Sequence, residues 1–214
     1  MERFGPTRRG GPVFRWLGEP LAVDLANTVM VVREDEMVDL IADPEGLRRW
    51  LDAERGRLGD CAFAVEHIER IRALRDAVRG LLSAAAQGAP SPAGALEAVN
   101  AASREAPMAP QLESDGGGEL RVRELTTDAE PLAQLLGALA RSTIALLTGP
   151  QRAQIHLCNA PSCGMVFIGA RRWCCAACGN RARAARHYRH KRERATRPLP
   201  LRPSERVEHV RRRS

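Results

Sequence analysis

Residues 158–188 read CNAPSCGMVFIGARRWCCAACGNRARAARHY, and this stretch holds five of the six cysteines of the 214-residue chain. Four of them form two close pairs, Cys158-x4-Cys163 and Cys174-x3-Cys178, with ten residues between the pairs. Each pair can wrap a tight knuckle that brings two sulfurs to about 2.3 Å from one ion, and ten residues are enough to return the chain. The spacing predicts one structural Zn²⁺ bound by four thiolates.

The fifth cysteine, Cys175, leaves the second pair ambiguous, because Cys175-x2-Cys178 also has zinc-ligand spacing. We assign Cys174 as the third ligand and keep Cys175 as the alternative, so that one of the two is a free thiol. A free thiol beside a ligand could be oxidised or could capture a ligand in a disulfide and release the zinc. Redox sensing through Cys175 is therefore an additional hypothesis.

Between the two pairs the sequence predicts a small hairpin. Met165 to Ile168 is apolar and suits a strand, Gly169 and Ala170 suit a turn, and Arg171 to Trp173 suits a return strand. Gly164 gives the first knuckle conformational freedom. Such a lobe is too small to fold on its own core, so the metal replaces the core.

Beyond Cys178 the sequence has high helical propensity to about Ala195. Zinc ligands at the start of a helix that follows a knuckle and a hairpin predict a treble-clef-like finger. Ala182, Ala185 and Tyr188 would form a thin face packed on the metal lobe, which leaves the arginines outward.

The two parts of the chain differ in net charge. Residues 1–170 carry 18 Lys and Arg against 23 Asp and Glu, whereas residues 171–214 carry 15 against 3. Arginine can form bidentate hydrogen bonds to phosphate or guanine. A high arginine content can also result from a GC-rich genome, so composition alone does not establish nucleic-acid binding. The residues that we expect to contact nucleic acid are Arg171, Arg172, Asn180, Arg181, Arg183, Arg186, Arg189, Lys191 and Arg192.

Two segments carry a resemblance to a known family. Cys178-Gly179-Asn180-Arg181, preceded by Arg172-Trp173-Cys174 and followed by Arg186-His187-Tyr188, resembles the CGNR zinc finger. Leu21–Val29, with its D-x-x-N-T pattern, and the later Leu47–Leu51 resemble the opening of the ABATE domain, which precedes that finger in the family. The resemblance implies a stress-induced transcription regulator that binds DNA. RNA binding, and a structural finger that binds a protein, are the alternatives.

The expected fold class is α+β: a mainly helical N-terminal domain with a small sheet, then the four-cysteine zinc finger and its basic helix. The hydrophobic content of 44% with only 4% aromatic residues favours helices packed through Leu, Ala, Val and Ile. We expect a flexible arm over residues 1–12, the ABATE-like domain over 13–155, the finger and basic helix over 156–197, and a disordered basic tail over 198–214.

Within the N-terminal domain, hydrophobic spacing predicts helices over 62–86, 95–102 and 131–147, and strands over 119–125 and 151–157. Asp43 is a predicted N-cap before Pro44, for a helix that buries Trp50. Residues 21–32 suit a buried helix at least as well as a strand.

Asp24, Asn27 and Thr28 interrupt that apolar segment. On a helix, residues three or four apart share a face, and buried polar groups need partners. One interpretation is that these side chains bond to each other or to nearby backbone and fix the packing. The other is that they form the polar floor of a small-molecule effector pocket, with the charged residues 33–39 beside it.

Other classes of protein are disfavoured by the sequence. No run of eighteen apolar residues occurs, and the clustered cysteines suit a reducing compartment, so we expect a cytoplasmic protein without a membrane span. Four thiolates leave zinc no open position for water, so we expect no enzyme activity. Proteins that read a DNA groove often act as dimers, so a homodimer is possible here, but no heptad pattern in the sequence indicates an interface.

Overall fold

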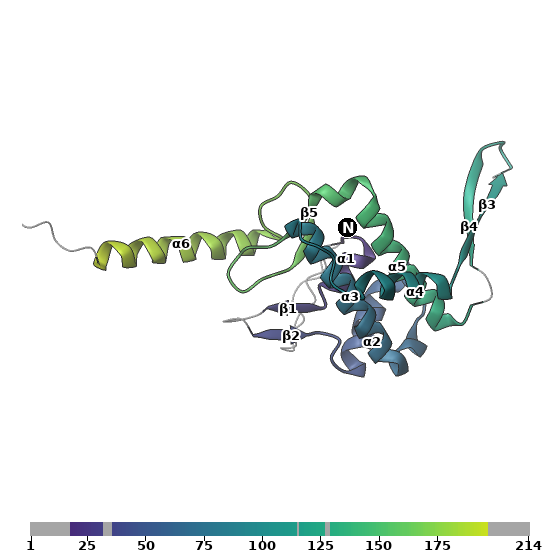
Figure 1. Cartoon of the computed structure of the whole chain (residues 1–214), viewed down its shortest axis with the longest axis horizontal. Coiled ribbons are helices and arrows are strands. Elements are labelled where there is room, and N and C mark those ends of the chain that lie inside the picture. The colour runs from purple at the N-terminus through teal and green to yellow at the C-terminus, as the bar shows by residue number, and fades with distance from the viewer. Residues whose placement is uncertain (1–17, 32–35, 115, 127–128, 197–214) are drawn as a thin grey trace, which may run out of the picture.

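The structure, a computed structural model, describes residues 18–31, 36–114, 116–126 and 129–196 (Figure 1). The predicted arm over 1–12 and tail over 198–214 lie outside these residues. The described elements are α1 (Leu21–Ala26), β1 (Val29–Val31), β2 (Met37–Asp39), α2 (Pro44–Leu58), the 3₁₀ helix η1 (Ala62–His67), α3 (Ile68–Gln87), α4 (Ala95–Glu105), β3 (Met108–Ser114), β4 (Leu120–Thr126), α5 (Pro131–Thr148), the 3₁₀ helix η2 (Pro150–Gln154), β5 (Ile155–Leu157), β6 (Val166–Ile168) and α6 (Ala176–Thr196).

Helices α1 to α5 surround one apolar core, which confirms the mainly helical fold. Helix α2 begins where the sequence predicts, because the backbone N–H of Gly46 donates to Asp43 Oδ1 at 2.7 Å. Trp50 is fully buried in this core. Helix α5 is long and apolar enough to cross a membrane by length and composition, but Leu135, Leu139 and other leucines bury its apolar face in the core.

The described part of the segment over 21–32, residues 21–31, divides into a helix and a strand. Helix α1 ends at Ala26, where Thr28 Oγ1 donates to the carbonyl of Leu25 at 2.7 Å and the chain turns. The β-branched Val29 and Val31 then pair with β2 in the register Val29 to Asp39. The sequence left helix and strand open for this segment, and the structure has a helix to Ala26 and a strand from Val29.

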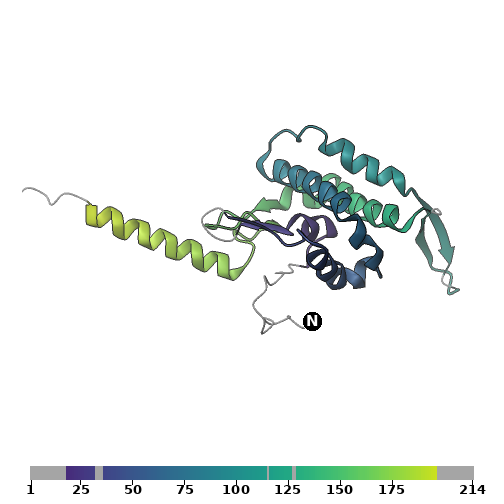
Figure 2. The ribbon, with the colours of Figure 1, turned by 90° about the horizontal axis from the view of Figure 1, so that it is seen from below.

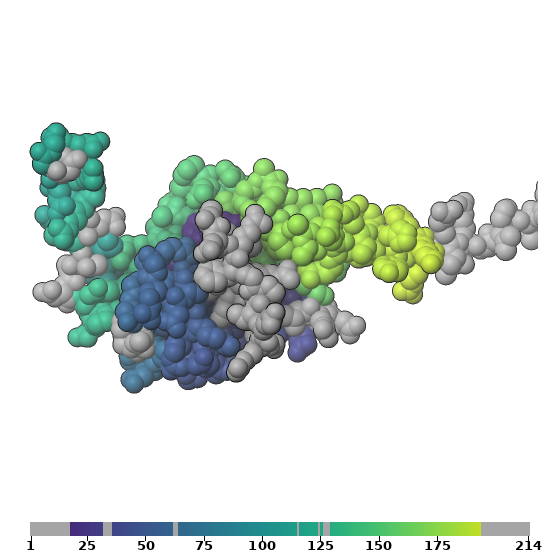
Figure 3. All heavy atoms as spheres, turned by 180° about the vertical axis from the view of Figure 1, so that it is seen from behind, coloured from purple at the N-terminus to yellow at the C-terminus, as the bar shows by residue number. Residues whose placement is uncertain are grey.

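Strands β3 and β4 form a hairpin that projects from one end of the domain (Figures 1 and 3). The register runs from Met108 opposite Thr126 to Ser114 opposite Leu120. Gly116 and Gly118, at φ 78° and 90°, lie between the strands in the left-handed region that favours glycine. The strand over 119–125 was predicted, but its partner β3 was not.

The finger's hairpin differs from the prediction. Strand β6 pairs with β5, which precedes the first cysteine, and residues 171–173 form no strand. The first knuckle closes the hairpin: the N–H of Cys158 donates to the Met165 carbonyl at 2.8 Å, and the N–H of Gly164 to the Cys158 carbonyl at 3.2 Å. The tight turn of the knuckle returns the chain directly alongside β5, so no later return strand is needed.

The side chains along β6 point alternately to two sides, and each side packs in a different apolar cluster, which joins the finger to the helical domain. Val166 and Ile168 face the main core, together with Ile155 of β5. Met165 and Phe167 face the other way and pack among the four clustered cysteines. One short strand therefore contributes to both apolar clusters, and the finger is continuous with the domain rather than tethered to it (Figure 2).

Candidate metal centre and nucleic-acid interface

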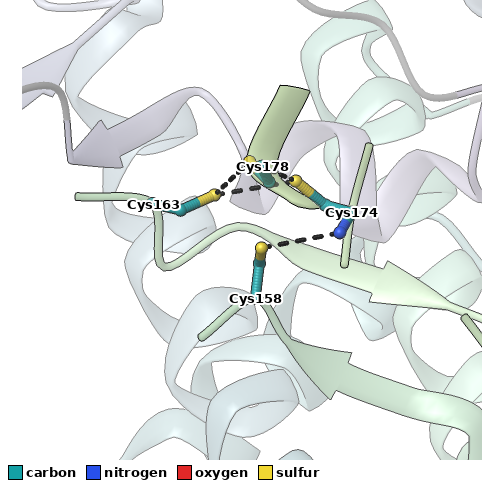
Figure 4. Close-up of side chains that lie close together, drawn as sticks. All are labelled: Cys158, Cys163, Cys174 and Cys178. Carbon is teal, nitrogen blue, oxygen red and sulfur yellow. Dashed lines mark hydrogen bonds between the residues drawn. The ribbon is translucent and has the colours of Figure 1, made fainter. Parts of the chain in front are cut away.

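The Sγ atoms of Cys158, Cys163, Cys174 and Cys178 lie within 4.8 Å of one another, and all four residues are buried (Figure 4). The separations are 3.6 Å from Cys163 to Cys174, 3.4 Å from Cys174 to Cys178 and 3.6 Å from Cys178 to Cys163. A zinc tetrahedron with 2.3 Å arms has edges of about 3.8 Å. The four thiols therefore fit one structural Zn²⁺.

The electrostatics of the cluster also suit a cation. The hydrogen bond to Cys163 and then burial raise the pKa of Cys174, and burial is the main cause of the raised pKa of Cys178. The hydrogen bond from Cys174 lowers the pKa of Cys163. One thiolate is thus favoured while further thiolates repel it, and a divalent cation at the centre removes that repulsion.

Cys174, not Cys175, belongs to the four-sulfur cluster. Cys175 is half-buried and lies outside the set, although its thiol contributes to the raised pKa of Cys178. The N–H of Cys174 also points to Cys158 Sγ at 3.5 Å. Redox sensing through Cys175 stays a prediction.

Each residue after Cys178 in the CGNR motif has a local role. A Cβ on Gly179 would lie 3.1 Å from Trp173 Cδ1, so glycine leaves room for the indole ring. Arg183 donates to Asn180 Oδ1. Arg181 Nη2 lies 3.1 Å from Cys178 Sγ, where it donates to the ligand sulfur. Arg181 is exposed, as expected, and its guanidinium also reaches back to the ligand sulfur, which the sequence did not predict.

Helix α6 begins at Ala176, so Cys178 lies in its first turn rather than before it. The positive end of the helix therefore lies at the sulfur cluster, which favours thiolate. Ala182 is buried and Ala185 is half-buried, but Tyr188 is 67% exposed. The predicted packing face therefore ends before Tyr188, and most of α6 projects away from the zinc lobe (Figure 1).

The residues predicted to contact nucleic acid divide into two groups. Arg171 forms an ion pair with Glu19 and lies 5.1 Å from the centre of the Phe167 ring, while Arg172 lies 5.2 Å from the centre of the Trp173 ring. With Arg181, they lie at the lobe. All nine residues are exposed, and the other six lie along α6: Asn180, Arg183, Arg186, Arg189, Lys191 and Arg192.

Asp24, Asn27 and Thr28 are buried, and each has a protein partner. Thr28 bonds to the Leu25 carbonyl. Asn27 Nδ2 donates to the Val166 carbonyl at 2.9 Å and Asn27 Oδ1 accepts from the Val166 N–H at 2.9 Å. These bonds are of the kind expected from the packing interpretation, and Asn27 bonds to the finger rather than to nearby backbone.

Asp24 lies in a buried cluster of two carboxylates and one guanidinium. The side chains of Asp24 and Glu54 are each 2% exposed, and both bond to Arg57. Burial raises the pKa of Asp24 to about 6, against the hydrogen bond from Arg57, which lowers it. Burial likewise raises the pKa of Glu54. One cation thus compensates two carboxylates that have little access to water.

Arg79 of α3 is a residue of this interface that sequence reasoning missed. Its Nη1 donates to the carbonyls of Ala26 and Val29 at 2.9 Å, and its Nη2 lies 3.4 Å from the Gly164 carbonyl of the first knuckle. In the sequence it looks like one of several polar residues on an amphipathic helix. Its role depends on which segments pack against α3, and no local pattern reveals this.

These features define a two-part protein: a helical domain that is fused through a shared strand to a four-cysteine zinc finger with a basic helix. Comparison with known families places residues 19–150 in ABATE, described as "Putative stress-induced transcription regulator", and residues 154–191 in the CGNR zinc finger. The chain belongs to the ABATE family and carries a CGNR finger at its C-terminal end. A comparison with curated proteins found no match.

Proposed function

We propose that this chain is a transcription regulator that binds duplex DNA through α6, with the zinc lobe as a rigid mount. The observation that carries the proposal is the geometry of α6: its first turn is fixed at the sulfur cluster, and its remaining turns project from the body with exposed basic side chains (Figure 1). The family description, transcription regulation, supports the same role.

Charge on α6 is arranged around the helix rather than along one stripe. Arg183, Arg186, Arg189 and Arg192 recur every three residues, so each lies about 60° further round the helix than the one before, and Lys191 lies on another face. A helix that is polar all round and leaves its domain needs another source of stabilisation. A DNA major groove about 12 Å wide admits a helix of 10–12 Å diameter and places phosphates on both of its sides.

This geometry favours DNA over duplex RNA, because the major groove of A-form RNA is too deep and narrow for side chains to read. The proposal assigns no catalytic role to the zinc, since four thiolates complete its shell. A cytoplasmic location remains our expectation.

The N-terminal domain is proposed to regulate the finger. Asp24, Asn27 and Thr28 already bond to protein groups, so an effector at this site would act by shifting those bonds. The bonds from Asn27 and Arg79 to residues 164–166 give such a shift a direct route to the metal lobe. This route, rather than the two-part architecture alone, supports the regulatory role.

Selection of genomic fragments with the zinc-loaded full chain tests the function. We expect enrichment of duplex DNA, retained against an excess of duplex RNA. The triple variant Arg183→Gln/Arg186→Gln/Arg189→Gln should lose it. A control of equal charge change, Arg48→Gln/Arg55→Gln/Arg104→Gln on α2 and α4, should retain it. Equal recovery by both variants, or no enrichment by the unmodified chain, would contradict the proposal.

A further inference from the structure

Cys175 and Cys178 form a C-x-x-C pair at the start of α6. Cys175 immediately precedes the helix, and its carbonyl accepts the N–H of Gly179 at 3.2 Å, so the first helical turn closes over it. Its side chain packs against the cluster of four cysteines, and its thiol shares a hydrogen bond with the thiol of Cys178. The fold therefore places a fifth sulfur in contact with a zinc ligand.

The five sulfurs differ in their access to solvent. The four ligand residues are between 2% and 6% exposed, whereas Cys175 is half-buried. Bound zinc also protects the ligand thiolates, because each gives an electron pair to the metal. Cysteine oxidation is selective for accessible sulfur. A small oxidant that arrives from solvent therefore meets Cys175 first.

Helix geometry selects Cys178 as the sulfur that Cys175 can join. The Cα atoms of bridged cysteines usually lie about 4.4–6.8 Å apart. Positions three apart on a helical turn have Cα atoms about 5 Å apart, which is within that range. Adjacent Cα atoms are only about 3.8 Å apart, so a bridge from Cys175 to Cys174 is disfavoured. The first turn of α6 can thus hold a Cys175–Cys178 disulfide without unwinding.

We propose that Cys175 is an oxidation site for hydroperoxides and that Cys178 is its resolving cysteine. The Cys175 sulfur attacks the O–O bond and becomes a sulfenic acid, and its proton leaves with the other oxygen as an alcohol or water. The Cys178 thiolate then leaves the zinc and attacks the sulfenic sulfur, which forms the disulfide and expels hydroxide. The hydroperoxide accepts the two electrons that the two sulfurs lose.

The disulfide removes one of the four zinc ligands. The three remaining thiolates leave one position of the metal to water, so zinc is held less tightly. Cys178 also fixes the first turn of α6 at the lobe, where Arg181 Nη2 bonds to its sulfur at 3.1 Å. A lower DNA affinity of the oxidised chain would follow, and that consequence rests on the proposed function. Oxidation and zinc release do not rest on it.

Hydrogen peroxide, added to the zinc-loaded full chain in the presence of a chromogenic zinc chelator, tests the proposal. We expect zinc release that is at least tenfold slower in Cys175→Ser and in Cys175→Ala. Both variants keep the four ligands and should hold one zinc per chain before oxidation. Cys61→Ser removes the buried cysteine outside the cluster and should release zinc within twofold of the unmodified rate. A thiol reductant and added zinc should restore the oxidised site.

Mass spectrometry locates the disulfide. The tryptic peptide Trp173–Arg181 contains three cysteines. Alkylation without reduction, early in zinc release, should label Cys174 but neither Cys175 nor Cys178. Three results would overturn the proposal: no zinc release from the unmodified chain, release at the unmodified rate in both Cys175 variants, or a first disulfide that includes Cys174 or Cys163.

Discussion

Asn27 and Val166 exchange two hydrogen bonds, each 2.9 Å long, across 139 positions of sequence. One partner ends the first helix of the ABATE domain and the other begins the strand that lines the metal cluster. Both are buried. The D-x-x-N-T segment therefore holds the zinc finger against the domain, and the two parts are expected to fold as one unit.

Replacement of Asn27 by alanine should be strongly destabilising. It leaves the N–H and C=O of Val166 without these partners, and each unsatisfied buried group costs about 1–3 kcal/mol. We expect the free energy of unfolding of Asn27→Ala to fall by about 2–5 kcal/mol in a denaturant titration. Asn100→Ala, at an exposed position of α4, is the control and should change it by less than about 1 kcal/mol. Equal small effects would mean that the Asn27 bonds contribute little.

Arg181→Ala should weaken zinc binding, because it removes the guanidinium that donates to Cys178 Sγ. Loss of a group that hydrogen-bonds to a metal ligand typically lowers metal affinity by about 10–100-fold. Competition with a chromogenic chelator measures the change. Arg186→Ala, further along α6, should leave zinc affinity unaltered, and a matching loss in both variants would show that general helix charge is responsible.

The buried cluster around Asp24 predicts a pH dependence of stability. The folded pKa of Asp24, about 6, exceeds the ordinary value of 3.8, so the native state binds the proton more tightly. Stability contributed by this proton is complete below about pH 4 and is lost as pH rises to about 6, by up to about 3 kcal/mol.

Asp24→Asn removes this titration. The free energy of unfolding of Asp24→Asn minus that of the unmodified chain should therefore rise between pH 4 and pH 6 and become constant above about pH 7. Taking the difference cancels the protonation of the zinc thiolates, which both proteins share. A flat difference would mean that the folded pKa of Asp24 equals its ordinary value, and a falling difference that it lies below that value; either result would contradict the raised pKa.

Zinc removal should destabilise the helical domain as well as the finger, because β6 packs into both apolar clusters. The fluorescence of Trp50 reports on the main core of the helical domain, and that of Trp173 reports on the cluster around the four cysteines. In a Trp16→Phe background, single-tryptophan variants should show coincident thermal transitions, both shifted to lower temperature by a chelator. If the Trp50 transition kept its midpoint while the Trp173 transition moved, the two parts would be independent units.

The sequence predicted the features that depend on local spacing. The four zinc ligands follow from the two cysteine pairs, and the start of α2 follows from Asp43 and Pro44. Cys174 could not be separated from Cys175 by spacing, since both suit the second pair. The structure separates them because helix α6 begins at Ala176, which leaves Cys174 at the cluster and Cys175 outside it.

Features that depend on distant parts of the chain were missed. Strand β3 contains Pro110 and lacks regular alternation, so it forms mainly because β4 lies across the glycine turn. The pairing of β6 with β5 depends on how the first knuckle closes, and the bond from Asn27 to Val166 depends on the packing of the whole domain. Tyr188 was expected to pack, but α6 leaves the lobe before its position.

The salt dependence of duplex binding tests the central claim, DNA binding by α6, most directly. Fluorescence anisotropy with zinc-loaded chain between about 50 and 200 mM salt should give a steep negative slope of log affinity against log salt, because each neutralised phosphate contributes roughly −0.9. Arg183→Gln/Arg186→Gln/Arg189→Gln should reduce the magnitude of that slope by about 2–3, while the control variant with Arg48, Arg55 and Arg104 replaced retains it. A flat salt response of the unmodified chain, or equal slopes for the two triple variants, would contradict the account.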